Sequence, residues 1–257
     1  MDYNFHTHTY RCRHAKDTEE EYIRCAIEGG IRHMGFADHA PLRFADGFES
    51  TFRVPVDSAR EYCETIAALR EKYKGKIELY IGFEMEYFSE MFEEMLANVR
   101  SYGAEYLILG QHYYAPEHPH GSHSFQPHSD PADMRAFAGS LVEAMGKGIF
   151  TYVAHPDMFR YTGDPAVYKE EARRICIAAR ETDTPLEINF LGIRDNRIYP
   201  NEDFWQIAGE EQSPVTFGFD AHDAPAACDR ASLPRAMELV KKYNLRYIGM
   251  PKLRLLG

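Results

Sequence analysis

Short runs of consecutive apolar residues alternate along the chain with longer stretches in which apolar residues recur every three or four positions. Several of the short runs are rich in β-branched and aromatic residues, which is typical of strands buried on both faces of a parallel sheet. We expect seven such strands, at residues 3–5, 34–37, 77–83, 106–109, 150–154, 186–189 and 215–219, and an eighth near Tyr247 and Ile248.

The stretches between these runs have the periodicity of amphipathic helices. Two sets of apolar residues fall on single helical faces: Tyr62, Ile66, Leu69 and Tyr73, and Tyr168, Ala172, Ile175 and Ala179. Asp130 followed by Pro131 is a helix start, and Gly146 or Gly148 marks its end. Strand and helix alternate throughout, without a long linker or a solenoid repeat, so the pattern predicts an α/β fold of the (β/α) barrel type.

Size and charge narrow the class of protein. The chain has 257 residues, close to the typical size of one α/β barrel, about 250 residues. We therefore expect a single domain over residues 1–257. A hydrophobic content of 44% is enough for a sizeable core. The net charge of −11 argues against nucleic acid as a partner, because such binding needs surplus lysine and arginine.

The cysteines and the lengths of the apolar segments indicate in which compartment the protein is expected. The five cysteines are scattered, odd in number and never spaced as C-x-x-C, so we expect packed thiols in a reducing compartment. The first residues lack the basic and apolar regions of a secretory signal. No run of about 18 apolar residues occurs, which predicts that no helix spans a membrane. We expect a cytoplasmic protein with no membrane partner, and its oligomeric state stays open.

Nearly every predicted strand ends in a residue that can bind a metal or ionise. These residues are His6, His8, Asp38, His39, Glu84, His112, His155, Glu187, Asp220 and His222. In a barrel the carboxyl ends of the strands converge on one face, where active sites lie. Imidazoles mixed with carboxylates favour zinc, manganese, iron or cobalt over calcium or magnesium. The sequence therefore predicts a metal site on this face.

One long loop, residues 116–130, is rich in Pro, His, Ser and Gly. Such loops are usually lids, binding loops or mobile segments. We interpret its histidines as loop residues and not as ligands, and His33 as a packed or solvated side chain. The loop histidines are His118, His120, His123 and His128.

Several motifs together resemble the PHP (polymerase and histidinol phosphatase) family, and most of all its histidinol-phosphatase branch. They are His6-Thr-His8-Thr, His14, Phe-Ala-Asp38-His39, Gly-Phe-Glu84, Gly-Gln-His112, His155-Pro-Asp157 and Gly-Phe-Asp220-Ala-His222. The resemblance runs from residue 6 to about residue 223, and it is specific because every ligand type occurs in order. His-x-His alone would be weak, since amidohydrolase barrels share it.

The resemblance implies a distorted (β/α)7 TIM-like barrel with three divalent transition metals, zinc, manganese or iron. Carried over by position, His6, His8, Glu84 and Asp220 would hold the first ion. Glu84 would also bind a second ion with His112 and His155, and His14, His39 and His222 would hold the third. A metal-activated hydroxide would be the nucleophile.

Three clustered cations favour an anionic substrate, above all a phosphomonoester. Arg160, Arg194 and Arg197 follow predicted strands, and their guanidinium forks match phosphate oxygens, so we expect them to bind substrate. Asp38 either orients a ligand histidine or protonates the leaving group, and we favour orientation. With Glu84 and Asp220 it completes the candidate catalytic residues. Glu187 is interpreted as a hydrogen-bonding residue and not as a ligand, and Asp157 is ambiguous.

The expected activity is hydrolysis of L-histidinol phosphate to L-histidinol and phosphate, a step of histidine biosynthesis, and the substrate rests on the resemblance. Alternatives are a PHP phosphoesterase acting on a nucleotide, a sugar phosphate or phosphotyrosine, and an amidohydrolase that cleaves C–N bonds. A non-catalytic regulator that kept its ligands is a further alternative. A polymerase-associated exonuclease is disfavoured, because the chain has no basic stripe.

Overall fold

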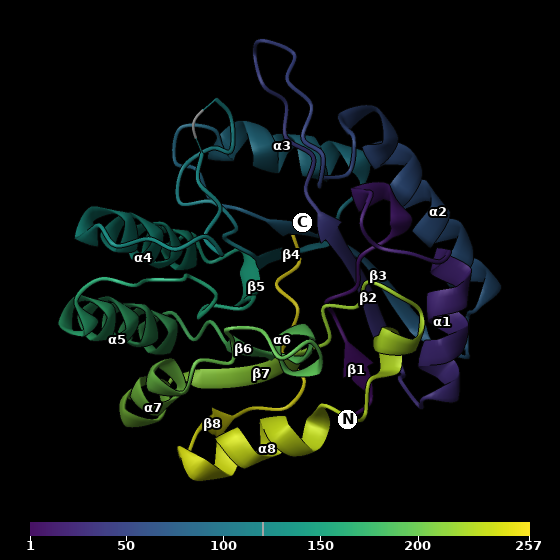
Figure 1. The fold of residues 1–257 in the computed structure, drawn as a ribbon. Coiled ribbons are helices and arrows are strands. Elements are labelled where there is room, and N and C mark those ends of the chain that lie inside the picture. The colour runs from purple at the N-terminus through teal and green to yellow at the C-terminus, as the bar shows by residue number, and fades with distance from the viewer. Residues whose placement is uncertain (120) are drawn as a thin grey trace.

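The computed structural model describes residues 1–119 and 121–257, and its centre is a parallel sheet whose eight strands follow one another in chain order (Figure 1). The strands are β1 (Tyr3–Asn4), β2 (His33–His39), β3 (Glu78–Met85), β4 (Tyr106–Leu109), β5 (Phe150–Val153), β6 (Leu186–Asn189), β7 (Pro214–Gly218) and β8 (Arg246–Tyr247). The predicted strands are confirmed. β2 extends into polar residues beyond its predicted end because His39 is paired with Glu84 across the sheet.

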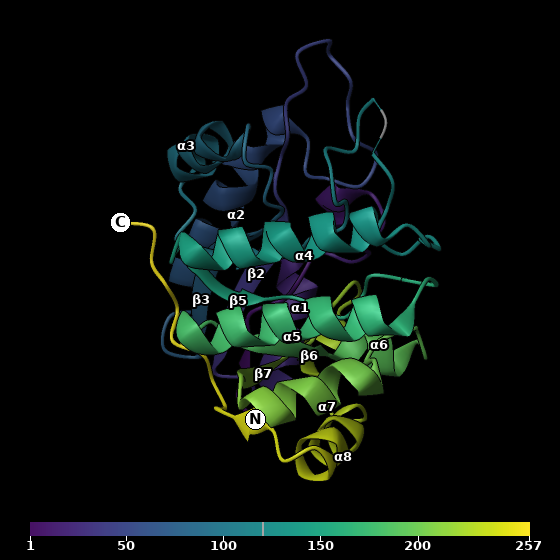
Figure 2. The same ribbon diagram turned by 90° about the vertical axis from the view of Figure 1, so that its left-hand side faces the viewer.

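Helices cover the outside of this sheet. They are α1 (Glu19–Glu28), α2 (Ala59–Lys72), α3 (Phe92–Tyr102), α4 (Pro131–Gly146), α5 (Pro165–Glu181), α6 (Phe190–Arg194), α7 (Glu202–Glu211) and α8 (Leu233–Lys242). The predicted start of α4 is confirmed, since the Asp130 side chain accepts a hydrogen bond from the amide of Ala132. α4, α5 and α7 lie side by side along one flank (Figure 2).

The sheet closes into a barrel only at the carboxyl ends of its strands. Beyond β1 and β7, the amide of His8 donates to the carbonyl of Ala221 at 2.9 Å, and the amide of Ala221 donates to the carbonyl of His6 at 3.1 Å. β8 instead pairs with Pro214 and Val215 at the opposite end of β7. Seven strands therefore form the rim that carries the site, and the predicted distorted (β/α)7 barrel is confirmed.

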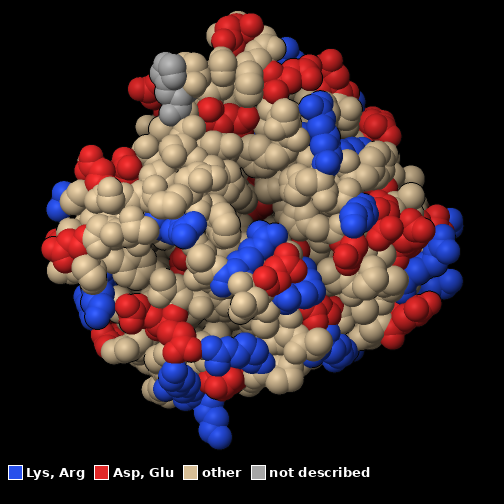
Figure 3. All heavy atoms as spheres, in the orientation of Figure 1, with Lys and Arg blue, Asp and Glu red and all other residues tan. Residues whose placement is uncertain are grey.

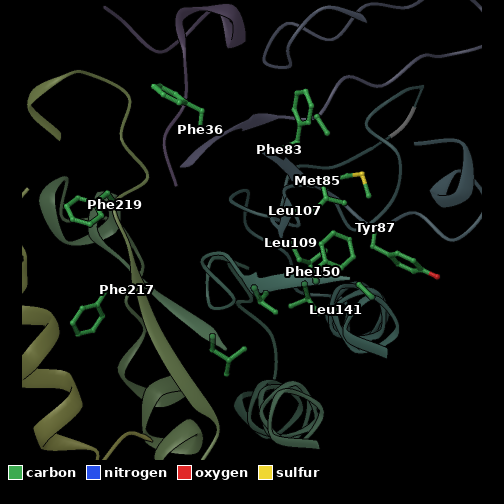
Figure 4. Packing of buried hydrophobic residues seen from close by; sticks show 14 of the residues in the cluster. Phe36, Phe83, Met85, Tyr87, Leu107, Leu109, Leu141, Phe150, Phe217 and Phe219 are labelled. Carbon is green, nitrogen blue, oxygen red and sulfur yellow. The ribbon is translucent and has the colours of Figure 1, made fainter. Parts of the chain in front are cut away.

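Hydrophobic side chains fill both sides of the barrel wall. Leu107 and Leu109 of β4 pack outward near Phe150 and near Leu141 of α4 (Figure 4). Tyr106 points into the barrel, where a Cβ atom at Gly35 would lie 2.1 Å from its hydroxyl oxygen. The interior is thus packed with side chains, and polar residues gather above it at the rim.

The structure also shows the state of the cysteines and the lengths of the helices, which the sequence analysis addressed. Cys12, Cys63 and Cys176 are buried, and all five cysteines are free thiols. Within residues 1–119 and 121–257, every helix is too short or too polar to cross a membrane.

Candidate active site

The nine predicted metal ligands converge at the rim of the barrel. Their ligand atoms form overlapping groups of three in which all atoms lie within 4.8 Å of one another. The groups are His6, His8 and Glu84; His6, His155 and Asp220; His39, Glu84 and His112; and His14, His39 and His222. Strands far apart in sequence bring these residues together because their carboxyl ends share one face. We call the nine residues the ligand cluster.

Glu84, at the end of β3, lies at the centre of the ligand cluster, and five imidazoles surround its carboxylate. The nitrogen–oxygen distances are 2.8 Å to His155, 3.1 Å to His39, 3.6 Å to His6, 3.6 Å to His8 and 3.7 Å to His112. The side chain is 1% exposed. One carboxylate therefore faces donors that the resemblance assigns to different ions.

Neighbouring glycines make room for the buried carboxylates. A Cβ atom at Gly110 would lie 1.9 Å from Oε1 of Glu84, and one at Gly218 would lie 1.6 Å from Oε1 of Glu187. Distances this short are incompatible with a side chain. Both positions therefore need glycine for the carboxylates to keep their places.

Burial and charge set the protonation of the ligand cluster. Burial opposes ionisation of Glu84, but the imidazoles of His112, His6 and His39 hold its pKa well below the usual range. Burial also lowers the pKa of His39 and of His112 well below the ordinary value, and that of His222 to about 3. These three neutral imidazoles keep a nitrogen lone pair available, which metal coordination requires. Burial opposes protonation of His6, but the carboxylates of Glu187, Asp220 and Glu84 raise its pKa to about 10, so a cation bound there would displace a proton.

Two ligands occupy strained backbone conformations. His155 has φ of 31° and Asp220 has φ of 47°, both in the left-handed region that side-chain-bearing residues rarely adopt. Such strain persists where the surrounding structure imposes it, typically at functional sites. Here the strained conformation turns the backbone sharply after β5 and after β7, and it directs the side chains of His155 and Asp220 into the ligand cluster.

Carboxylates behind the ligands fix the orientation of two imidazoles. Glu187 accepts a hydrogen bond from Nδ1 of His6 at 2.7 Å and another from the amide of His155 at 3.0 Å. Asp38 lies 3.3 Å from Nδ1 of His8, and it accepts from the amide of Thr9 at 3.0 Å. Asp38 is fully buried behind His8, a position that suits orienting this ligand better than protonating a leaving group.

The residues present fit divalent transition metals. Nε2 of His6, Nε2 of His8 and both carboxylate oxygens of Glu84 are buried without a hydrogen-bond partner. Buried polar atoms are normally paired, so four orphans that face one another indicate a ligand outside the chain. Imidazole and carboxylate together suit zinc, manganese or iron.

A cavity of about 780 Å³ opens above the ligand cluster. His14, His39, His112, His155, Asp220 and His222 line it, and Lys16, Arg194 and Arg197 stand at its edge. Figure 3 shows the hollow near the middle of this face, with acidic atoms at its bottom and basic side chains along its lower rim. An anionic group that enters the cavity would meet these cations.

The three predicted arginines differ in position. Arg197 lines the cavity and bonds to the hydroxyl of Tyr199 at 3.2 Å. Arg194 lines it too, but its guanidinium is engaged by Asp229 at 2.9 Å. The structure does not bring Arg160 to this cavity. Arg160 lines a separate cavity of about 350 Å³, since its backbone bonds to Ser124 and His128 turn it away.

The loop over residues 116–130 is attached to the body of the protein at several points. The amide of Ser124 donates to the carbonyl of His112 at 2.7 Å, and Nδ1 of His128 lies 3.2 Å from Asp133. His118 pairs with Asp46 at 2.7 Å. His120 lies outside the described residues.

Sequence reasoning overlooked three residues of the site. His123 lines the cavity although we interpreted it as a loop residue, and burial lowers its pKa to about 4. Lys16 also lines the cavity, and its place two residues after His14 was a usable signal. Cys12 lies with His8 and His222 in a further group of possible ligand atoms. Asp157, which was ambiguous, accepts a hydrogen bond from Nε1 of Trp205 at 2.8 Å.

Comparisons with known proteins agree with this geometry. The PHP domain family matches residues 4–190. A probable histidinol-phosphatase of Deinococcus radiodurans is 26% identical over 84% of this chain and 85% of its own length. The histidinol-phosphatase of Bacillus subtilis is 25% identical over 85% of this chain and 92% of its own.

Among solved structures, the fold is similar to histidinol phosphate phosphatase from Lactococcus lactis, complexed with zinc, L-histidinol and phosphate. The TM-score is 0.71 at 20% identity, covering 96% of this chain and 95% of the other.

Proposed function

This chain belongs to the PHP domain family, and on that premise we propose that it is a metal-dependent phosphatase that hydrolyses L-histidinol phosphate to L-histidinol and phosphate. The observation that carries the proposal is Glu84, whose buried carboxylate is surrounded by five imidazoles beneath a cavity with cationic residues at its edge.

Three divalent ions are the proposed cofactors. By the resemblance, His6, His8, Glu84 and Asp220 would hold one, Glu84 with His112 and His155 a second, and His14, His39 and His222 a third. The ligand atoms of His6, His8 and Glu84 lie within 4.8 Å of one another, as do those of His14, His39 and His222. When bound, divalent cations supply Lewis-acid catalysis, since they polarise phosphoryl oxygens and lower the pKa of water.

In this scheme, residues of the chain bind the phosphate of the substrate and orient the imidazoles that hold the ions. Arg197 is the best placed of the three arginines to bind the phosphate, because its guanidinium is not held by a buried carboxylate as that of Arg194 is. Lys16 adds a second positive charge at the cavity edge. Glu187 and Asp38 hold the imidazoles of His6 and His8 at fixed angles. Fixed donors at the reacting phosphate need little rearrangement during the reaction.

The names of the similar proteins support histidinol phosphate as the substrate. The cavity also offers aromatic side chains, Phe52, Tyr113 and Phe125, against which a flat ring can pack. The net charge of −11 disfavours nucleic acid as a substrate, and the five free thiols support a cytoplasmic setting.

Arg197 and Lys16 would bind the phosphate group, which every phosphomonoester carries, so a PHP phosphatase with another phosphomonoester as substrate is the second candidate. Phosphate release by metal-loaded protein from L-histidinol phosphate, a nucleoside monophosphate, a sugar phosphate and phosphotyrosine tests both. We expect kcat/KM for L-histidinol phosphate to exceed the others by about 100-fold or more, because polar groups that fit one substrate are left unpaired by its rivals. A higher kcat/KM for any other substrate would establish the second candidate instead.

A further inference from the structure

Glu86 is a buried carboxylate next to the ligand cluster to which the scheme above gives no role. It follows β3, and its side chain is 1% exposed. One carboxylate oxygen, Oε2, accepts a hydrogen bond from Arg53. The other, Oε1, has no hydrogen-bond partner and lies 3.8 Å from Nδ1 of His112.

Arg53 holds Glu86 in place from the other side. The guanidinium is 2% exposed, and its Nε donates to Glu117 at 2.8 Å. Arg53 comes from the segment before α2, and Glu117 comes from the loop over residues 116–130. Arg53 is thus shared between two carboxylates, and Oε1 of Glu86 stays unpaired on the side that faces His112.

Nδ1 of His112 is also buried and without a hydrogen-bond partner. Two facing orphans, a carboxylate oxygen and an imidazole nitrogen, make an unusual pair, because burying such groups unpaired is costly. Their separation of 3.8 Å is too long for a hydrogen bond, although a small rotation of the imidazole would close it.

In two other ligands, Nδ1 of the imidazole lies closer to a buried carboxylate than it does in His112. Nδ1 of His6 donates to Glu187 at 2.7 Å, and Nδ1 of His8 faces Asp38 at 3.3 Å. In each case the remaining nitrogen, Nε2, points to the centre of the ligand cluster. Metal-binding imidazoles characteristically donate their other N–H to a carboxylate, which fixes their tautomer and angle.

We propose that Glu86 is a positioning residue that accepts the Nδ1–H of His112 once Nε2 of His112 binds a divalent cation. The proposal rests on the proposed function, because it requires an ion at the ligand cluster. Arg53 and Glu117 keep Glu86 in place, and they connect the long loop to this ligand through buried ion pairs.

Two variants of Glu86 separate its effect on His112 from general stability. Glu86→Leu removes the acceptor but leaves Arg53 paired with Glu117. Glu86→Gln keeps an acceptor oxygen without the charge. Glu171→Gln is the matched control, because Glu171 is a buried carboxylate on α5 that bonds to Arg174 at 2.6 Å.

The experiment loads each protein with zinc and measures metal content and affinity by competition with a chelator. We expect Glu86→Leu to bind one of its ions about 10- to 100-fold more weakly than wild type, the usual effect of removing such a partner. Glu86→Gln should lose less, and Glu171→Gln should match wild type. A merely structural role would lower the melting temperature of the metal-free protein and leave every zinc affinity unchanged, and that result would overturn the proposal.

A second measurement needs no Glu86 variant. In wild-type protein, zinc loading should produce a slowly exchanging imidazole proton, assigned to His112 by its absence in His112→Asn. If zinc binds and no such proton forms, the role of Glu86 is wrong while the proposed function stands. Wild-type protein that binds no zinc, manganese or iron would overturn both.

Discussion

Glu84 is the residue whose replacement tests the site most specifically. Glu84→Gln keeps the size of the side chain but removes the charge that five imidazoles surround. Loss of a partner behind a ligand typically costs about 10- to 100-fold in metal affinity or activity, so loss of this carboxylate should lower kcat/KM by more than about 100-fold. Phosphate release by the metal-loaded variant measures it. Near-normal rates in a folded variant would exclude Glu84 as a shared ligand.

The arginines near the site give a second prediction for single residues. Arg197 lines the cavity above the ligand cluster, whereas Arg160 lines a different one. Arg197→Ala should raise KM for the phosphomonoester about 10-fold or more, because charge-assisted hydrogen bonds to an anion contribute about 1.5–3 kcal/mol. Arg160→Ala should leave KM unchanged. The opposite pattern in steady-state kinetics would show that Arg160, and not Arg197, binds substrate.

Single residues also mark the limit of prediction from sequence. Eight members of the ligand cluster were predictable because they follow or end strands, and strand ends of a barrel meet on one face. His14 follows the turn at residues 10–12, and only the family resemblance indicated it. The position of Arg160 was not predictable, since it depends on backbone bonds to Ser124 and His128 in a loop without regular structure. Glu86 gave no signal either, because its role depends on where Arg53 and His112 meet it in space.

Neighbouring strands leave the space that the buried side chains of the site need, and replacing Gly110 tests this packing. Gly110 follows β4, beside Glu84 of β3, and a methyl group there would overlap the Glu84 carboxylate. Gly110→Ala should displace Glu84 and lower metal content without abolishing the fold. Elemental analysis and circular dichroism check the two parts. Full metal content in Gly110→Ala would contradict the packing described here.

The contact between α7 and α8 predicts a pH dependence. Hydrogen bonds from Lys242, Tyr243 and Arg235 lower the pKa of Glu202 from 4.5 to about 2. A carboxylate with a lowered pKa stabilises the folded state fully above its unfolded pKa, and this contribution disappears as the pH falls through the folded value. Glu202→Gln should therefore be less stable than wild type at pH 7, and the difference should shrink below pH 4.5. Urea unfolding at several pH values measures it, and a difference independent of pH would contradict the contact.

Elements were predicted better than their ends. Apolar runs predicted all the strands, whereas β2 and β3 extend into polar residues because His39 pairs with Glu84 across the sheet. Periodicity cannot indicate such an extension, since Asp38, His39 and Glu84, the polar residues near the ends of β2 and β3, belong to the site.

In the whole molecule, the site brings together residues that follow the first and the seventh strand of the barrel. His6 and His8 follow the first strand and Asp220 follows the seventh, and their backbones close the rim at Ala221. Metal binding should therefore stabilise the folded chain, because the ligands come together only when the barrel is closed. At a free zinc concentration of 100 times Kd, the free energy of unfolding should rise by about 2.7 kcal/mol. Denaturant unfolding with and without zinc measures this, and equal stability would exclude a site that forms on folding.

We propose that nine residues, eight from the ends of six strands and His14 from the segment after residues 10–12, together hold catalytic cations. Metal content and phosphatase activity of the same sample, before and after chelation and after reloading, test it most directly. We expect close to three divalent transition metals per chain, loss of L-histidinol phosphate hydrolysis on their removal, and recovery when they return. Metal-free protein that keeps full activity would contradict it.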